Sequence, residues 1–183
     1  MTKVYVFLAD GFEEIEGLTV VDVLRRAGAE VTTVSISDTK NICGSHAIKL
    51  EADALFAETD FSDAAILVLP GGMPGTKYLG AHKGLTELLV KTNEAGGGIA
   101  AICAAPSVLG DLGILKGKKA VCYPGFEERL TGADVQTCSV VTDGNVTTSR
   151  GMGTAIDFAL ELVKRLFGAE KAENLAKSII YCR

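Results

Sequence analysis

The stretch GIAAICAAP, residues 98–106, decides the fold that this sequence predicts. Its first five residues are small and apolar, as in a buried strand of a sheet that is covered on both faces. The strand ends at Cys103, and Pro106 with the apolar run 107–112 predicts a helix. Such a turn presents its central side chain at the carboxyl edge of a parallel sheet, as in nucleophile elbows. The stretch alone leaves open a second interpretation, in which Cys103 is a small buried hydrophobic residue.

The rest of the chain alternates between apolar runs typical of strands and amphipathic runs typical of helices. Strands are predicted over residues 4–9, 30–36, 65–69, 120–123, 136–141 and 146–149. Helices are predicted before Gly28, Gly96 and Gly168, and over residues 107–112 and 171–178. Residues 40–55 predict an antiparallel excursion, and Asp143-Gly144 predicts a hairpin turn. The alternation predicts an α/β fold with a doubly wound, mainly parallel sheet.

Composition limits the classes of protein to which the chain can belong. With 48% hydrophobic residues and 21 glycines among 183 residues, it suits a compact α/β protein rather than a disordered one. We expect residues 1–183 to form a single domain. The net charge of −5 argues against nucleic-acid binding driven by phosphate contacts.

The cysteines and the amino-terminal residues indicate a reducing compartment. Five cysteines occur at irregular spacings without a CxxC pair, so we expect free thiols, with neither a metal site nor a disulfide framework. The apolar run 4–9 is too short for a secretory signal, and no apolar segment reaches membrane-spanning length. We therefore expect a cytoplasmic protein without a membrane partner.

Three loops are predicted to meet beyond the carboxyl ends of the strands, at residues 10–16, 70–75 and 103–106. They bring together Glu16 and Cys103, and the backbone N–H groups of Gly72 and Ala104, which are placed to stabilise an oxyanion. A helix N-terminus lowers the pKa of a cysteine, whereas a carboxyl group beside a thiolate has a raised pKa. We therefore expect a Cys103 thiolate beside a protonated Glu16.

The two histidines are not placed to form a Cys-His pair. His46 falls in the predicted excursion and His82 in a polar loop before a helix, so we expect both to be surface residues. A Walker loop and a strand–GxGxxG–helix unit are both absent from the sequence. A nucleotide-binding site is not predicted, and a cysteine protease that uses histidine is disfavoured.

Four stretches, taken in order, resemble one known family. They are LADGFEEIE (8–16), LPGG (69–72), AAICAAP (100–106) and TSRGMGT (148–154). The chain thereby resembles the ThiJ/PfpI superfamily over nearly its whole length, as a bacterial-type member of the branch of the Parkinsonism-associated deglycase (DJ-one). The resemblance implies a flavodoxin-like, class I glutamine amidotransferase-like domain, a homodimer, and neither metal nor organic cofactor.

The resemblance also implies roles for particular residues. Cys103 matches the reactive cysteine and Glu16 the acidic partner that hydrogen-bonds to it, while Gly72 and Ala104 match the backbone donors. The pocket residues implied are Gly71, Tyr123, Arg150 and Met152.

Two of these pocket residues depart from the pattern. Tyr123 stands where some relatives have a histidine, and a phenol is a poor base near pH 7. Met152 stands where relatives often have a proline, and it changes the shape of the pocket. Cys122, beside Tyr123, is either a second thiol near the site or a buried strand residue.

The resemblance implies a glutathione-independent glyoxalase or deglycase acting on small α-oxoaldehydes such as methylglyoxal, or on glycated amines and thiols. An alternative is an oxidative-stress sensor or redox chaperone, because an accessible thiolate oxidises readily. A PfpI-type peptidase is a minor alternative, since those relatives carry a histidine directly after the nucleophile and this chain has Ala104. An amidotransferase would need a downstream histidine, and none follows His82.

Overall fold

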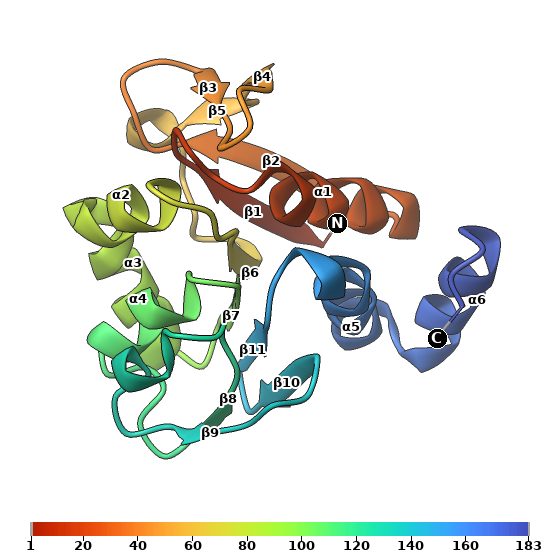
Figure 1. Cartoon of the computed structure of the whole chain (residues 1–183). Helices are drawn as coiled ribbons and strands as arrows, with labels where there is room; N and C mark the ends of the chain where they lie inside the picture. The colour runs from red at the N-terminus through yellow and green to blue at the C-terminus, as the bar shows by residue number, and fades with distance from the viewer. Residues whose placement is uncertain (1, 183) are drawn as a thin grey trace.

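The chain has an α/β architecture in which helices cover both faces of one large sheet (Figure 1). The computed structural model describes residues 2–182. The strands of the large sheet are β1 (Lys3–Leu8), β2 (Glu30–Ser35), β5 (Ala54–Leu55), β6 (Ala64–Leu69), β7 (Gly98–Ile102), β10 (Val140–Asp143) and β11 (Val146–Ser149). Their order is β10-β11-β7-β6-β1-β2-β5, and every neighbouring pair is parallel except β10 and β11. The prediction of a mainly parallel sheet is confirmed.

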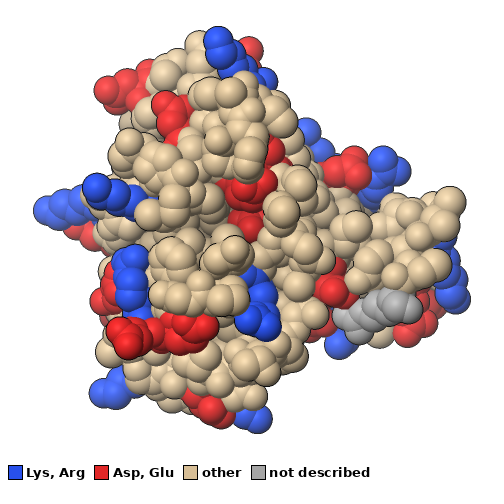
Figure 2. All heavy atoms as spheres, viewed as in Figure 1, with Lys and Arg blue, Asp and Glu red and all other residues tan. Residues whose placement is uncertain are grey.

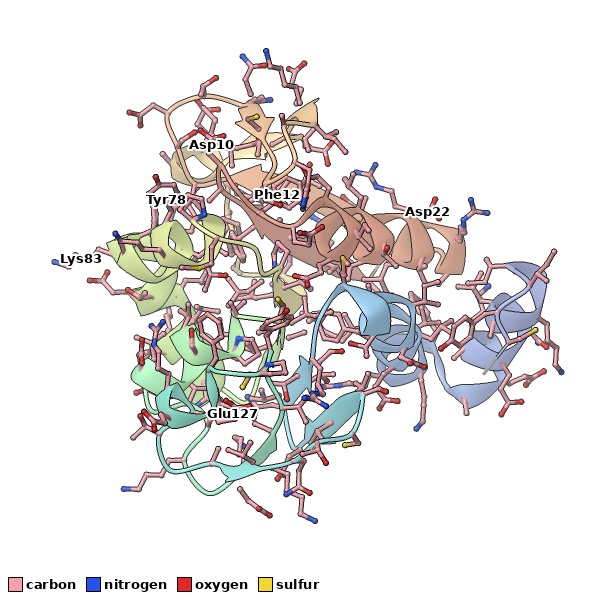
Figure 3. The ribbon with its side chains drawn as sticks, in the orientation of Figure 1. Asp10, Phe12, Asp22, Tyr78, Lys83 and Glu127 are labelled. Carbon is pink, nitrogen blue, oxygen red and sulfur yellow. The ribbon has the colours of Figure 1, made fainter. Side chains whose placement is uncertain are left out.

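Two helical layers enclose this sheet. The helices are α1 (Glu14–Ala27), α2 (Gly75–Ala81), α3 (Lys83–Glu94), α4 (Pro106–Asp111), α5 (Ala155–Phe167) and α6 (Ala169–Ser178). Helices α1 and α5 pack together on one face with α6 beside them, and α2, α3 and α4 cover the other face (Figure 1). In the space between the sheet and α1 lies the fully buried ring of Phe12, whereas Asp22 and Lys83 point outward (Figure 3).

Strand β1 shows why its sequence is a continuous apolar run rather than an alternating one. Val4, Val6 and Leu8 belong to the core under α1 and α5, while Tyr5 and Phe7 belong to the core under α2, α3 and α4. Both faces of the strand are therefore removed from water, as in the interior of a doubly wound sheet. At about 25 cal/mol per Å² of buried apolar surface, such strands contribute strongly to the free energy of unfolding.

Short elements lie around the edges of the sheet. A separate antiparallel pair joins β3 (Asn41–Cys43) to β4 (Lys49–Glu51), which confirms the predicted excursion. A second small pair joins β8 (Lys119–Ala120) to β9 (Asp134–Val135). Single helical turns are η1 (Phe56–Glu58), η2 (Glu127–Arg129) and η3 (Met152–Thr154). No helix within residues 2–182 is long and apolar enough to cross a membrane.

The glycine signals in the sequence correctly predicted two helix ends and the hairpin turn. Gly28 ends α1 in the left-handed conformation with φ 97°, where its N–H donates to the carbonyl groups of Leu24 and Arg25. Gly168 ends α5, and Gly144 lies in the turn between β10 and β11 with φ 57°.

Two of the predicted strands have wrong boundaries, and one helix was missed. The strand expected over residues 120–123 stops at Ala120, because Tyr123 instead donates its N–H to the Cys103 carbonyl. The strand expected over residues 136–141 begins only at Val140. Helix α2 was not predicted at all, since glycine and proline at its start gave the signals of a plain turn.

Candidate active site

Cys103 occupies a nucleophile elbow between β7 and α4. Its φ of 66° lies in the left-handed region, which costs a non-glycine residue energy and persists only where neighbours hold it. The Cys103 N–H donates to the Ser149 carbonyl at 2.9 Å, and the Tyr123 N–H donates to the Cys103 carbonyl at 2.8 Å. The side chain is half-buried rather than enclosed. The predicted strand-to-helix turn is confirmed, and Cys103 is presented at the carboxyl edge of the sheet.

Glu16 reaches the same place from the first turn of α1, and no part of it is exposed to solvent. The Gly71 N–H donates to Oε2 of this carboxyl at 2.9 Å. The Cys103 thiol lies beside the carboxyl and lowers its pKa, and Oε1 has no hydrogen-bond partner among the described residues. The structure therefore brings the two predicted catalytic side chains together, with the carboxyl of Glu16 removed from water and Cys103 half-buried beside it.

Gly71 and Gly72 make this close approach possible. A Cβ added at Gly71 would lie 2.5 Å from the Cys103 Cβ and 2.6 Å from Glu16 Oε2, so only glycine fits there. Gly72 has a φ of 89°, which a residue with a side chain adopts only at a cost. The N–H groups of Gly72 and Ala104 hydrogen-bond to the Cys103 sulfur and favour its ionised form. Both predicted backbone donors thus lie at the sulfur atom.

Glu16 and Cys103 each change the pKa of the other. Burial raises the pKa of Glu16 to about 7, against the hydrogen bonds from Cys103 and Gly71, which lower it. Burial, followed by the negative charge of Glu16, raises the pKa of Cys103 to about 12. The raised pKa predicted for Glu16 is confirmed, but the lowered pKa predicted for Cys103 is wrong, because the turn also buries the sulfur beside a carboxylate. Between these two values the pair holds one proton.

The side of the site away from Glu16 is open. Tyr123 is 51% exposed and Met152 is 56% exposed, and with Arg150 they line a groove of about 380 Å³. Gly151 connects this groove to the buried pair: a Cβ there would lie 3.2 Å from the Tyr123 ring and 4.0 Å from Glu16 Oε1. Three of the predicted pocket residues, Tyr123, Arg150 and Met152, thus lie together in this groove, whereas Gly71 lies apart from them, against Cys103 and Glu16.

Neither histidine approaches Cys103 in a hydrogen bond. His82 is half-buried rather than a surface residue, because its Nδ1 accepts from the Leu85 N–H at the start of α3 and its ring packs on Phe56. His46 is exposed, as predicted, and its Nδ1 lies 3.0 Å from Glu14 Oε2.

One cluster within residues 2–182 has the composition of a metal site, namely Glu13, Glu14 and His46. Both oxygens of Glu14 are already engaged, since Oε1 accepts from the His46 N–H and Oε2 contacts Ser45 and the His46 ring. Burial opposes ionisation of Glu14, yet these hydrogen bonds lower its pKa to about 2. The polar groups of the cluster therefore form hydrogen bonds with one another, and these bonds hold α1 against the loop that follows β3.

Two residues near the site were not found from the sequence. Ser149 holds the elbow through its carbonyl, and its hydroxyl donates to the Ser139 carbonyl and pairs with Thr154. Glu13 contributes a negative charge that raises the pKa of Glu16. Ser149 belongs to TSRGMGT, so the signal was present, but only strand register shows that it lies beside Ile102. Cys122 is buried in the core opposite Cys103 and lies outside any strand.

The fold and the site define a class of protein: a doubly wound α/β protein with a cysteine at its nucleophile elbow and a buried glutamate beside it. Residues 2–165 match the model of the DJ-1/PfpI family. The chain belongs to this family.

Individual relatives agree with this assignment. The chain is 40% identical over 176 residues to Protein DJ-1 homolog A of Arabidopsis thaliana, covering 94% of this chain and 45% of that protein. It therefore spans less than half the length of that relative. It is 34% identical to the glutathione-independent glyoxalase DJR-1.2 of Caenorhabditis elegans, covering 91% of this chain and 89% of that one. The solved structure of oxidized Toxoplasma gondii DJ-1 superposes with a TM-score of 0.96 at 36% identity and covers all of both chains.

Proposed function

We propose that this protein is a glutathione-independent glyoxalase that converts methylglyoxal-type α-oxoaldehydes into 2-hydroxy acids. The observation that carries the proposal is the contact between the Cys103 thiol and the fully buried Glu16 carboxyl. A general base works best when its pKa lies near the working pH, and burial brings the pKa of Glu16 to about 7. A similar chain from Caenorhabditis elegans carries the name of this activity.

In the first step, the Cys103 sulfur attacks the aldehyde carbon of the substrate. The sulfur–carbon bond forms and the carbonyl electron pair moves to oxygen, while the thiol proton passes through Glu16 to that oxygen. The product is a hemithioacetal. The N–H groups of Gly72 and Ala104 stabilise the negative charge that develops beside the sulfur. Because the pair holds one proton, attack requires no separate histidine base.

In the second step, Glu16 moves a proton between adjacent carbons. The carboxylate removes the proton of the former aldehyde carbon and delivers it to the ketone oxygen, as the electron pair shifts and an enediol forms. The hydroxyl of the first carbon then gives up its proton to Glu16, which delivers it to the second carbon, and a thioester results. The first carbon is thereby oxidised by two electrons and the second is reduced by two. Water then cleaves the sulfur–carbon bond, releasing the hydroxy acid and the Cys103 thiol.

The same chemistry extends to adducts of an oxoaldehyde with an amine or a thiol. If the aldehyde carbon already carries such a group, that group leaves when Cys103 displaces it, which would be deglycase activity. The open side of the site favours this extension, because Tyr123 and Met152 are half-exposed and line a groove that is open to solvent.

The test is production of lactate from methylglyoxal by the purified protein in an amine-free buffer. We expect steady turnover in the wild type and in Cys182→Ser, which removes an exposed thiol outside the site. Cys103→Ser should reduce turnover at least about 10³-fold, since it removes the nucleophile. Lactate formation at the wild-type rate by Cys103→Ser would contradict the proposal. A parallel assay in an amine buffer identifies reversible adducts that imitate deglycation.

A second candidate function is an oxidation sensor or redox chaperone, favoured by the solved oxidized form of a relative with 36% identity. Cys103 is half-buried, and the N–H groups at its sulfur would stabilise an oxidised, negatively charged sulfur. We expect mild peroxide to modify Cys103 before the exposed Cys182 in peptide mass spectrometry. Modification of Cys182 first would remove this candidate.

We further propose that the protein is a cytoplasmic homodimer, in which residues 1–183 form one domain that works without a cofactor. Ile15 and Leu18 of α1 and Ile48 of the excursion are 51%, 38% and 52% exposed, which favours contact with a second copy. Light scattering after size-exclusion chromatography should give twice the mass of one chain. A mass of one chain at micromolar concentration would contradict the dimer.

A further inference from the structure

We propose that the groove beside Cys103 selects α-oxoaldehydes whose far end carries a carboxylate, and that Arg150 binds this group. The proposal rests on the proposed glyoxalase function and names its substrate class. Tyr123, Arg150 and Met152 define the groove together with neighbouring backbone, and its volume is about 380 Å³. This groove lies within the size range of small-molecule sites.

Methylglyoxal leaves most of this volume empty. At roughly 30 Å³ for each non-hydrogen atom, taken from the volume of one water molecule in the liquid, the groove holds about a dozen such atoms. A three-carbon oxoaldehyde fills less than about half of it. The half-exposed side chains of Tyr123 and Met152 offer apolar surface for a longer carbon chain.

Arg150 gives the groove a positive charge. It is the only charged side chain among the described residues that line the groove. Within residues 2–182 no carboxylate lies within ion-pair distance of its guanidinium, although six other lysine or arginine side chains have such a partner. The Arg150 Nη1 donates to the Thr137 carbonyl at 3.2 Å, which holds the side chain while leaving other N–H donors for a ligand.

The register of the sheet places the backbone of Arg150 next to that of Cys103. Ser149 pairs with Ile102 between the parallel strands β11 and β7, so Arg150 and Cys103 leave neighbouring strands side by side. Neighbouring strands lie about 4.8 Å apart, so the groove that Arg150 lines begins one strand away from Cys103. On the face shown in Figure 2, acidic side chains lie near the centre and a basic patch lies below them, with uncharged residues between.

The discriminating substrates are 4,5-dioxopentanoate and its methyl ester. Both carry the same α-oxoaldehyde, and only the first has a terminal carboxylate. Glyoxalase chemistry adds water to the acid and yields 2-hydroxyglutarate, with the aldehyde carbon oxidised and the ketone carbon reduced. We expect the wild type to have a kcat/KM about tenfold higher for the acid than for the ester, as for a charge-assisted hydrogen bond, with the difference in KM.

Variants and salt locate the source of this preference. Arg150→Gln should bring the ratio of the two kcat/KM values to about one, whereas Arg150→Lys should retain part of it. Arg26→Gln, which removes the same charge from an exposed arginine on α1, should keep the wild-type ratio. In the wild type, 0.5 M NaCl should reduce the ratio, a readout that needs no variant. A wild-type ratio near one, or an unchanged ratio in Arg150→Gln, would overturn the proposal.

A measurement without turnover separates this proposal from the glyoxalase function. Glutarate has the terminal carboxylate but no aldehyde, and it should slow alkylation of Cys103 by iodoacetamide in the wild type and not in Arg150→Gln. If methylglyoxal gives no lactate but glutarate protects, the glyoxalase function fails and the anion site stands. If lactate forms but glutarate gives equal protection in both proteins, or none in either, the role of Arg150 is refuted.

Discussion

The two sides of Cys103 differ in how much change they can accept. The closed wall is formed by the buried Glu16 and Gly71 and the half-buried Gly72, and neither glycine has space for one added methyl group. The open wall, formed by Tyr123, Arg150 and Met152, is exposed or half-buried. In the proposed mechanism, the closed wall would fix the distance over which a proton moves, and the open wall would determine which molecule reaches the sulfur. The proposal therefore assigns chemistry and selectivity to opposite sides of Cys103.

The largest effect expected from a single methyl group is at Gly71. In Gly71→Ala the new Cβ would lie 2.5 Å from the Cys103 Cβ, so the thiol and the carboxyl must move apart. Overpacking of this kind costs about 1–3 kcal/mol of stability, and misplacement of reacting groups lowers kcat about 10²-fold. Lactate assays and urea unfolding measure the two effects.

The matched variant on the open side is Gly153→Ala. A Cβ at Gly153 meets nothing within 4 Å, so its cost should be less than about threefold in kcat/KM. Equal losses in the two glycine variants would show that the walls do not differ.

The second effect is the pH dependence of stability that Glu16 introduces. Its pKa is raised from 4.5 to about 7 in the folded protein, so the stability contributed by the protonated group is present below pH 4.5 and is lost as pH rises through 7. The loss is about 3 kcal/mol between pH 4 and pH 8. Glu16→Gln has no carboxyl to titrate and so does not lose this stability. Between pH 4 and pH 8 the free energy of unfolding of Glu16→Gln, measured by urea unfolding, should therefore rise by that amount relative to that of the wild type. If the free energies of unfolding of the two proteins changed in parallel with pH, the pKa of Glu16 would not be raised by burial.

The smallest effect is expected on the open wall. Tyr123 stands where some relatives have a histidine, and its half-exposed hydroxyl is available to water. Tyr123→Phe should therefore lower kcat/KM with methylglyoxal only about two- to threefold, the value of one hydrogen bond that water replaces in part. Steady-state kinetics at pH 7 measure it. A loss of more than about 10²-fold would show that a proton-transfer group lies on the open wall, and the closed and open walls would then not differ in function.

Much of the closed wall could be predicted from the sequence because its constraints are local. A few consecutive residues are enough to recognise each of its features. These features are the abrupt end of the strand at Cys103, the early position of Glu16 in its helix, and the glycines at 71 and 72. The mainly parallel sheet followed in the same way from alternating apolar and amphipathic runs. Helix α2 was missed because Pro74 and Gly75 at its start gave the local signals of a plain turn.

The electrostatics of the site could not be predicted in the same way. A helix N-terminus lowers the pKa of a cysteine, and a buried carboxylate beside it raises that pKa, so the sign depends on distances and burial that no short stretch contains. In the structure burial and Glu16 outweigh the N–H groups of Gly72 and Ala104. Tyr123, Arg150 and Met152 were expected in the pocket, but the contact of Arg150 with Thr137 was not, since these two residues are brought together only by the strands around them.

The central claim is that Cys103 and Glu16 act as one unit that shares a proton, and Glu16→Gln tests it most directly. Glutamine keeps the size of the side chain and an acceptor for the Gly71 N–H, but it cannot carry a proton between two carbons. Lactate formed from methylglyoxal is measured for the wild type and for this variant, side by side at pH 7 in amine-free buffer. The account predicts a loss of about 10²–10⁴-fold in kcat, as for removal of a general base. Lactate formation by Glu16→Gln at a rate close to that of the wild type would contradict it.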